Sequence, residues 1–361
     1  MVLHSYYLNK TIGTTMRAMV LAGLRKIEIV DKPVPGPVKP DEVLIRMQSV
    51  GICGSDVHYY REGRIGSQVV KYPFTVGHEG AGIVEKAGSA VKRLRPGDRV
   101  AVEPAMPCYE CDQCRKKRFH TCRNLKFLGC PGQAEGCFSE FIVMPEKSCI
   151  PIKDNMTLDQ AALSEPLTIG MYSVHLAEPV EGKKVGILGS GPIGVSVMLA
   201  ARAFGSSKIY MTDKLDRRLT LVSEMGADWT GNPDNSDIIT DILKGEPGGL
   251  DIVFECCGQQ EAIDQAIRLL GPGGKLMIVG IPSFSRWSFD VDDLRRKEIT
   301  VQNVRRQNQM AEKTIEMIAS GKIIPDAMQT HIFDLEQIRE AFDMVDNYRD
   351  GVMKAMIRFG D

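Results

Sequence analysis

Hydrophobic and polar positions follow two different patterns along this chain of 361 residues. Between Arg17 and Leu163, short apolar runs alternate with polar positions and are separated by glycine and proline turns such as Pro96-Gly97-Asp98. This pattern predicts a β-rich domain of short strands. Beyond Leu163, continuous apolar runs at 250–255 and 275–281 are separated by stretches with helical spacing. That pattern predicts a parallel sheet covered by helices on both faces, so the fold class is α/β with two domains.

The clearest local pattern is one strand, a glycine turn, one helix and a second strand. An apolar strand at 185–188 precedes the sequence GSGPIG at 189–194, and a helical stretch at 195–204 leads to a strand at 208–212 that Asp213 closes. The GxGxxG spacing permits a tight turn, close approach of a pyrophosphate and close packing of helix on strand. We therefore predict a βαβ nucleotide-binding unit with the pyrophosphate at the helix N-terminus.

The identity of the nucleotide depends on the charges that follow the second strand. The Asp213 carboxylate is placed to accept hydrogen bonds from both ribose hydroxyls of NAD, and it would repel the 2′-phosphate of NADP. Lys214 and Arg218 weigh the other way, because basic residues beside the ribose accept that phosphate. We predict NAD as the cofactor.

Composition excludes several classes of partner. Lys and Arg number 45 against 46 Asp and Glu, which gives a net charge of -1 and no electrostatic attraction toward nucleic acid or membrane. The apolar runs are strand-length, and residues 1–15 lack the basic flank and apolar core of a secretion signal, so we expect the folded body to begin near Met16. A cytoplasmic location is expected, with no nucleic-acid or membrane partner.

Four of the ten cysteines form a compact group at metal-site spacing. Cys108, Cys111, Cys114 and Cys122 follow the pattern CxxCxxCx7C. Four thiolates close a tetrahedral zinc site that has no open position and therefore stabilises a loop instead of supporting catalysis. Ligation of an iron–sulfur cluster is the main alternative.

A second group of potential ligands is more dispersed. Cys53 lies in GICGSDVH, His78 and Glu79 lie in GHEG, and Glu165 precedes a proline much later. A thiolate, an imidazole and a carboxylate, with one position open to water, are the ligand types of a catalytic zinc. Taken singly, each has another interpretation, since Cys53 suits a core position and His78 a hydrogen-bonded loop.

Together these motifs resemble the zinc-dependent medium-chain alcohol dehydrogenase family, and within it the polyol (sorbitol) dehydrogenase branch. The resemblance covers nearly the whole chain from Arg17 and rests on Gly77-His78-Glu79 followed by Gly82, Gly88 and Val91, on the four cysteines, and on Gly189 to Gly194. It implies a GroES-like β-rich catalytic domain at 1–166 and 306–361 that carries the structural zinc. A doubly wound Rossmann domain with a parallel sheet is implied at 167–305.

The resemblance also implies roles for individual residues. Glu165 stands where ordinary alcohol dehydrogenases have a cysteine, and either Glu79 or Glu165 is implied as the third ligand of a catalytic zinc held by Cys53 and His78. Ser55 and His58 resemble the proton relay, and Asp56 resembles a partner of His78. The implied catalytic residues are Cys53, Ser55, His58, His78, Glu79 and Glu165. The implied cofactor contacts are Gly189, Gly191, Ile193, Gly194, Asp213, Arg218, Val279, Gly280, Ile281 and Val304, and the implied substrate contacts are Tyr59, Glu165 and Arg305.

This reasoning predicts NAD-dependent oxidation of a secondary alcohol in a polyol to the ketone, by an enzyme with one catalytic and one structural zinc. The resemblance further implies a homotetramer. One departure affects the substrate, because Arg305 is followed by Arg306 where sorbitol dehydrogenase has a tyrosine. A sugar-acid or sugar-phosphate dehydrogenase would use that added cation, whereas a solvated or subunit-contacting Arg306 would leave a polyol as substrate. L-threonine 3-dehydrogenase and a catalytically silent nucleotide sensor are further alternatives.

Overall fold

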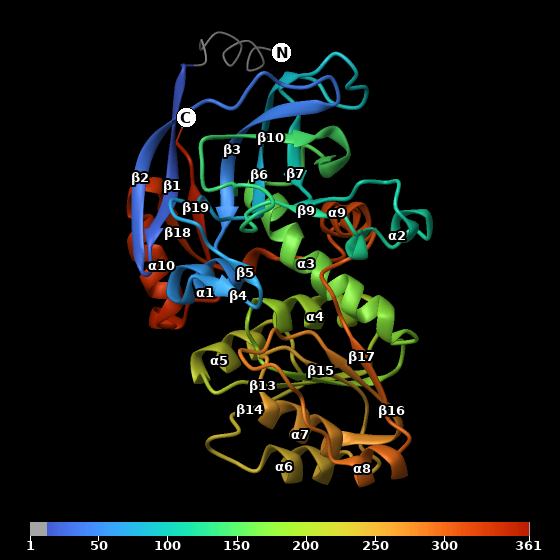
Figure 1. Cartoon of the computed structure of the whole chain (residues 1–361). Helices are drawn as coiled ribbons and strands as arrows, with labels where there is room; N and C mark the ends of the chain where they lie inside the picture. The colour runs from blue at the N-terminus through green and yellow to red at the C-terminus, as the bar shows by residue number, and fades with distance from the viewer. Residues whose placement is uncertain (1–12, 361) are drawn as a thin grey trace. The chain divides into compact units, whose positions relative to one another are not determined.

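A computed structural model describes residues 13–360 and divides the chain into two compact units (Figure 1). The first unit comprises residues up to Glu165 together with Gln329 onward, and the second comprises Pro166–Met328. Most of the polar stretch 1–15 lies outside the described residues, and the first strand begins at Thr15, one residue before the expected start of the folded body. No helix among residues 13–360 is long and apolar enough to cross a membrane.

The first unit is built mainly from short strands, as the alternating pattern predicts. Its strands are β1 (Thr15–Gly23), β2 (Lys26–Pro33), β3 (Glu42–Gly51), β4 (Arg64–Ile65), β5 (Gln68–Val69), β6 (Glu79–Ala87), β7 (Arg99–Val102), β8 (Ala105–Met106), β9 (Lys126–Phe127), β10 (Phe141–Pro145), β11 (Cys149–Pro151), β18 (Gln329–Asp334) and β19 (Lys354–Arg358). Its helices are α1 (Gly54–Glu62), α2 (Asp112–Arg115) and α10 (Ile338–Asp346).

A seven-stranded sheet organises this unit and joins distant parts of the chain. Its order is β11-β7-β6-β3-β19-β18, with β10 also paired to β3. The C-terminal β19, red in Figure 1, is therefore hydrogen-bonded to β3 from the first 51 residues. Phe138 and Phe342 are fully buried, and their ring centroids lie 5.7 Å apart in the core beside this sheet. Truncating a buried aromatic of this kind to alanine costs about 3–5 kcal/mol.

The second unit has the parallel sheet expected from its continuous apolar runs. Its elements are β12 (Lys184–Leu188), α4 (Pro192–Ala203), β13 (Lys208–Thr212), α5 (Asp216–Glu224), β14 (Trp229–Gly231), α6 (Ile238–Gly245), β15 (Leu250–Glu255), α7 (Gln260–Leu269), β16 (Leu270–Ile278), α8 (Val291–Arg296), β17 (Thr300–Asn303) and α9 (Ala311–Ala319). Helix α3 (Leu158–Ala177) contains the boundary between the two units. The strand order β14-β13-β12-β15-β16-β17 is the doubly wound order of a Rossmann fold.

Two boundaries differ from those expected. The strand at 275–281 ends instead at Ile278, because the N–H groups of Val279 and Gly280 both turn to the carbonyl of Glu255. The second unit extends to Met328 and not to 305. Helix α9 remains with it, and Lys313 Nζ lies 4.8 Å from the ring centroid of Phe204.

A buried carboxylate joins the amino ends of two central strands in the second unit. Glu246 is 3% exposed and accepts hydrogen bonds from Lys208 Nζ at 2.9 Å and Tyr210 Oη at 2.6 Å, and it also pairs with Lys184. The hydrogen bonds from Lys184, Tyr210 and Lys208 lower the pKa of Glu246 to about 2. Since the folded-state pKa is depressed, this contribution to stability is present above the unfolded pKa and is lost as the pH falls toward 2.

Candidate metal and cofactor sites

Cys53 lies at the junction between β3 and α1. It is the N-cap residue of α1, and its backbone carbonyl accepts hydrogen bonds from the N–H groups of Asp56 and Val57. The Asp56 carboxylate accepts the Cys53 N–H at 3.0 Å, so Cys53 and Asp56 each donate a backbone hydrogen bond to the other residue. This capping fixes the thiol at the positive end of a helix, where negative charge is favoured.

His78 lies directly before β6 and faces the same helix start. Asp56 is fully buried, and its Oδ1 accepts the Gly77 N–H at 3.1 Å and lies 3.5 Å from His78 Nδ1. Burial lowers the pKa of His78, but the charges of Asp56 and Cys53 and hydrogen bonds with both raise it well above its ordinary value. The imidazole is thus held between a carboxylate and a thiol, in surroundings that favour positive charge.

Glu79 completes a group of three possible ligands. The ligand atoms of Cys53, His78 and Glu79 all lie within 4.8 Å of one another. Glu79 is 1% exposed and pairs with a second buried group, Lys354, at 2.7 Å. One sulfur, one nitrogen and one oxygen in a partly enclosed space match the donor set of an open zinc site. The partner carboxylate on the second nitrogen of the histidine is also a regular feature of zinc-binding histidines.

Glu165 is not part of that compact group, although it belongs to the same unit. It is half-buried in α3, and burial raises its pKa to about 8, with the charges of Glu79 and Glu103 adding to the shift and those of His78 and Lys354 opposing it. The carboxyl is therefore close enough to interact with the three-residue group through its charge. Its role as third ligand or substrate contact stays a prediction.

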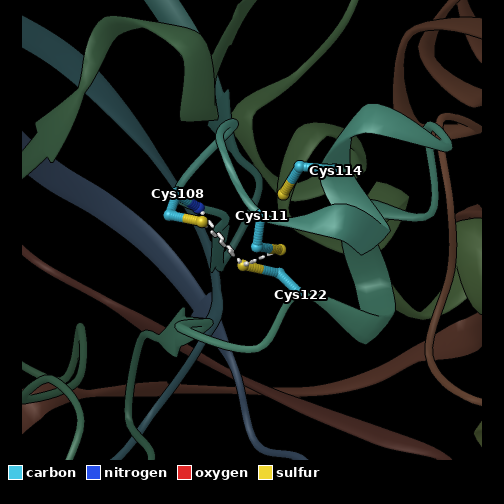
Figure 2. A group of neighbouring side chains, drawn as sticks. All are labelled: Cys108, Cys111, Cys114 and Cys122. Atoms are coloured by element: carbon cyan, nitrogen blue, oxygen red, sulfur yellow. Dashed lines mark hydrogen bonds between the residues drawn. The ribbon is translucent and has the colours of Figure 1, made fainter.

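The four cysteines of the lobe between β8 and β9 come together as their spacing predicts. Figure 2 shows their side chains gathered around one point, and all four sulfurs lie within 4.8 Å of one another. The Sγ atoms of Cys108 and Cys122 are 3.4 Å apart, and those of Cys111 and Cys122 are 3.9 Å apart. Tetrahedral Zn–S bonds of about 2.3 Å place sulfurs roughly 3.8 Å apart, so one zinc ion fits this set. A multi-iron cluster needs wider separations.

The pKa values of two of these thiols are shifted in opposite directions. Hydrogen bonds from the backbone of Arg123 and Cys114 lower the pKa of Cys111 to about 6, whereas burial raises the pKa of Cys114 to about 12. The N–H of Cys108 also donates to Cys122 Sγ at 3.3 Å. Backbone donors of this kind stabilise thiolates, which are the form that binds metal.

The glycine turn after β12 has the conformation that its sequence predicts. Gly189 has φ of 103°, in the left-handed region that favours glycine, and Gly191 is the N-cap of α4. A Cβ on Gly194 would lie 1.9 Å from the Gly189 carbonyl oxygen, so only glycine fits there. Free N–H groups at the start of α4 are available for a phosphate.

Asp213 is held rigidly at the end of β13. Its two oxygens accept the N–H of Ser190 at 2.8 Å and that of Leu215 at 2.9 Å. Lys214, by contrast, points into two ion pairs, with Asp234 at 2.8 Å and Glu261 at 3.3 Å. Arg218 Nη1 lies 3.9 Å from Asp213 Oδ2. The positive charges beside Asp213 are therefore already matched by carboxylates within the unit, a feature that the sequence did not reveal.

The remaining expected cofactor positions lie at the carboxyl ends of strands in the same sheet. Val279, Gly280 and Ile281 follow β16, and Val304 follows β17 and donates its N–H to the Ile278 carbonyl. In Rossmann folds the nucleotide binds at this edge of the sheet. Ile193 lies at the second position of α4.

The expected relay and substrate residues are distributed over both units. Ser55 and His58 are one helical turn apart in α1, and burial lowers the pKa of His58. Tyr59 is 5% exposed, and its hydroxyl donates to Gln68 Oε1 at 3.0 Å. Arg305 is exposed and belongs to the second unit. Their catalytic and substrate-binding roles stay predictions.

Sequence reasoning missed Lys354, which is 2% exposed and bonds both oxygens of Glu79. The two residues are 275 positions apart, and no local motif joins them. The only signal was a lysine directly before three apolar residues near the C-terminus.

Comparison with known families agrees with this geometry. Residues 39–154 match the alcohol dehydrogenase GroES-like domain, and residues 192–320 match the zinc-binding dehydrogenase domain. The chain is 35% identical to sorbitol dehydrogenase of Bacillus subtilis, over 96% of this chain and 98% of that protein. It is also 35% identical to L-idonate 5-dehydrogenase of Vitis vinifera, over 92% of each chain.

A solved structure has a similar fold. A protein of Sinorhizobium meliloti 1021, solved bound to NADP, superposes with a TM-score of 0.88 at 30% identity, covering 96% of this chain and 100% of that one. The chain therefore belongs to the zinc-binding, medium-chain alcohol dehydrogenase family. It is an oxidoreductase with a GroES-like domain and a Rossmann domain.

Proposed function

We propose that this dehydrogenase oxidises a secondary alcohol of a polyol to the ketone, with hydride transfer to NAD. The observation that carries this proposal is the group Cys53, His78 and Glu79, whose ligand atoms lie within 4.8 Å of one another. The similarity to sorbitol dehydrogenase of Bacillus subtilis supports a polyol as substrate. When bound there, zinc supplies Lewis acidity, which lowers the pKa of an alcohol.

The protein's own residues provide position and charge. Cys53 and His78 hold the metal, and Asp56 keeps the His78 ring in place through the contact at 3.5 Å. Burial raises the pKa of Glu165 to about 8, and its carboxyl is suited to hydrogen-bond a substrate hydroxyl. A second zinc in the four-cysteine lobe stabilises the loop between β8 and β9.

The reaction releases a proton that must reach solvent. Ser55 and His58, one turn apart on α1, supply a hydroxyl and an imidazole for this route. His58 is half-buried, and burial lowers its pKa, so it is neutral at pH 7 and able to accept a proton.

NAD is favoured over NADP by the charges after β13. Asp213 is fixed by two backbone N–H groups, and Lys214 is already paired with two carboxylates. A 2′-phosphate beside Asp213 is disfavoured by roughly 1–4 kcal/mol, or about fivefold to a thousandfold in affinity. We expect kcat/KM to favour NAD and Asp213→Ala to relax this preference. A native enzyme that favours NADP would refute the assignment.

A sugar acid is the second candidate substrate. L-idonate 5-dehydrogenase of Vitis vinifera has the same 35% identity to this chain as the sorbitol dehydrogenase, over 92% of the chain instead of 96%. Arg305 and Arg306 are adjacent cations that suit a carboxylate.

Turnover with a panel of substrates separates these functions. Purified enzyme is assayed with polyols, sugar acids, sugar phosphates and L-threonine, each with NAD and NADP. Highest kcat/KM with a polyol and NAD supports the proposal, and highest kcat/KM with a sugar acid supports the second candidate. No turnover with any alcohol in protein that contains two zincs would contradict both.

We also propose that the enzyme is a homotetramer. Val291 in the second unit is 72% exposed, which suits contact with another subunit. Light scattering at micromolar concentration is the measurement, and a monomer would refute the proposal.

A further inference from the structure

A buried lysine contacts Glu79 in the candidate zinc centre, and the proposed function gives this lysine no role. Lys354 on β19 is 2% exposed, and its Nζ donates to Glu79 Oε1 at 2.8 Å, Glu79 Oε2 at 2.7 Å and the Ile52 carbonyl at 3.2 Å. An ammonium group has three N–H donors, so each has an acceptor here. Ile52 directly precedes Cys53, and therefore Lys354 contacts both Glu79 and the segment that carries the thiol.

Strand register explains how a side chain from β6 reaches one from β19. Gly51 of β3 pairs with Glu79 on one side and with Met356 on the other. A Cβ on Gly51 would lie 2.3 Å from Glu79 Oε2. The Glu79 side chain therefore crosses β3 over Gly51 to reach Lys354, and this crossing needs a position without a side chain.

The pairing changes what Glu79 can offer a metal. Its carboxylate belongs to the group of Cys53 and His78, yet both of its oxygens already accept hydrogen bonds from one ammonium. Two cations then compete for the same pair of oxygens. Removing a partner that orients a ligand usually weakens metal binding by about 10–100-fold. Lys354 differs from such a partner because it is a cation on the oxygens that the metal would use, so the opposite sign is expected here.

We propose that Lys354 is a positioning residue that restrains Glu79 and so weakens the bond of this carboxylate to zinc. Three protein ligands leave the fourth zinc position open with or without this restraint, so the restraint acts on how tightly the metal is held. This inference rests on the proposed metal centre. The rate at which the catalytic zinc is released then depends on one lysine on β19.

The test compares zinc release from the full-length, zinc-loaded enzyme and its variants. Wild type, Lys354→Met, Lys354→Gln, Glu79→Gln and the double variant Lys354→Met/Glu79→Gln are mixed with a chelator, and the faster-released zinc is followed with a zinc-sensitive dye. We expect Lys354→Met to slow this release about tenfold, because Glu79 becomes free to bind the metal, and Lys354→Gln to slow it by a smaller factor, because the amide is uncharged but still bonds Glu79. In the Glu79→Gln background, Lys354→Met should have no further effect.

Two controls guard against a general structural effect. Lys32 also pairs with a glutamate in the first unit, Glu135 at 2.8 Å, so Lys32→Met should leave the release rate unchanged. Retention of the slowly released zinc and of the circular dichroism spectrum reports the fold. Lys354→Gln retains a polar group that can bond Glu79, so it serves where Lys354→Met fails to fold.

Two results overturn the inference, and they differ in what they imply. Faster or unchanged zinc release in Lys354→Met and Lys354→Gln would refute the restraint while leaving the metal centre intact. Slower release on adding Lys354→Met to Glu79→Gln would do the same, because the effect would then not depend on the Glu79 carboxylate. Wild-type enzyme with a single zinc per chain would refute the metal centre and the restraint together.

Discussion

The two candidate zinc sites lie in the same unit but are built in opposite ways. The four cysteines fall within residues 108–122, in one loop between two short strands. In the other centre, Cys53 follows β3, and His78 and Glu79 lie at the start of β6. Lys354, which pairs with Glu79, lies on β19. A local set of four thiolates leaves no open position, whereas a mixed set assembled over a sheet leaves room for substrate. We therefore expect the local site to serve stability and the distributed site to serve catalysis.

The largest expected difference between the two sites is in activity. Cys53→Ser should lower kcat/KM roughly a thousandfold or more, about 4 kcal/mol, because the mixed set loses its thiolate. Cys111→Ser should instead lower the melting temperature, by roughly 5 °C or more, because structural zinc contributes folding energy. Activity assays and thermal melts on both variants measure this. Equal loss of activity per folded molecule in both would remove the distinction.

Metal content gives the next contrast. We expect two zincs per chain by elemental analysis, and a chelator should remove the zinc of the Cys53–His78 centre first, because that set has an open position. Activity should decay with the release of this first zinc. Release of the second zinc should be accompanied by loss of the fold. Fully active enzyme with one zinc per chain would contradict the model of two sites.

Asp56→Asn tests how far the distributed centre depends on its surroundings. Asp56 joins the Cys53 N–H, the Gly77 N–H and His78 Nδ1. Loss of its charge should weaken zinc binding at this centre about 10–100-fold, since such partners fix the imidazole and increase its basicity. Zinc titration of the first-released site measures it. Unchanged affinity would mean that the contact at 3.5 Å does not orient the histidine.

Asp112→Asn is the matched substitution beside the four cysteines, and the smallest effect is expected there. Asp112 pairs with Arg123 on the surface of the lobe, where its Oδ2 lies 2.9 Å from Arg123 Nη2. Exposed ion pairs contribute little, because solvent screens them. Zinc content and thermal melting should both match wild type. A clear loss of the slowly released zinc would show that this pair supports the site.

The sequence by itself determined the local features. The strand, glycine turn and helix at 184–203 lie where the pattern predicts, and Gly189 and Gly194 have the conformation and close contacts that require glycine. The four cysteines likewise converge as their spacing indicates. Both predictions succeed because the interacting residues are neighbours in the chain, so that backbone geometry alone brings them together.

Only the tertiary structure decided what surrounds the distributed centre and the ribose site. Glu79 meets Lys354 across Gly51 because β19 joins the sheet beside β3, a pairing of strands that no local pattern encodes. Lys214 is matched by Asp234 and Glu261, which follow β14 and lie in α7. Helix α9 stays with the second unit, whereas the sequence placed it after the boundary at 305. Side-chain periodicity reports which face of an element is buried, but the partner of a buried charge depends on which elements become neighbours on folding.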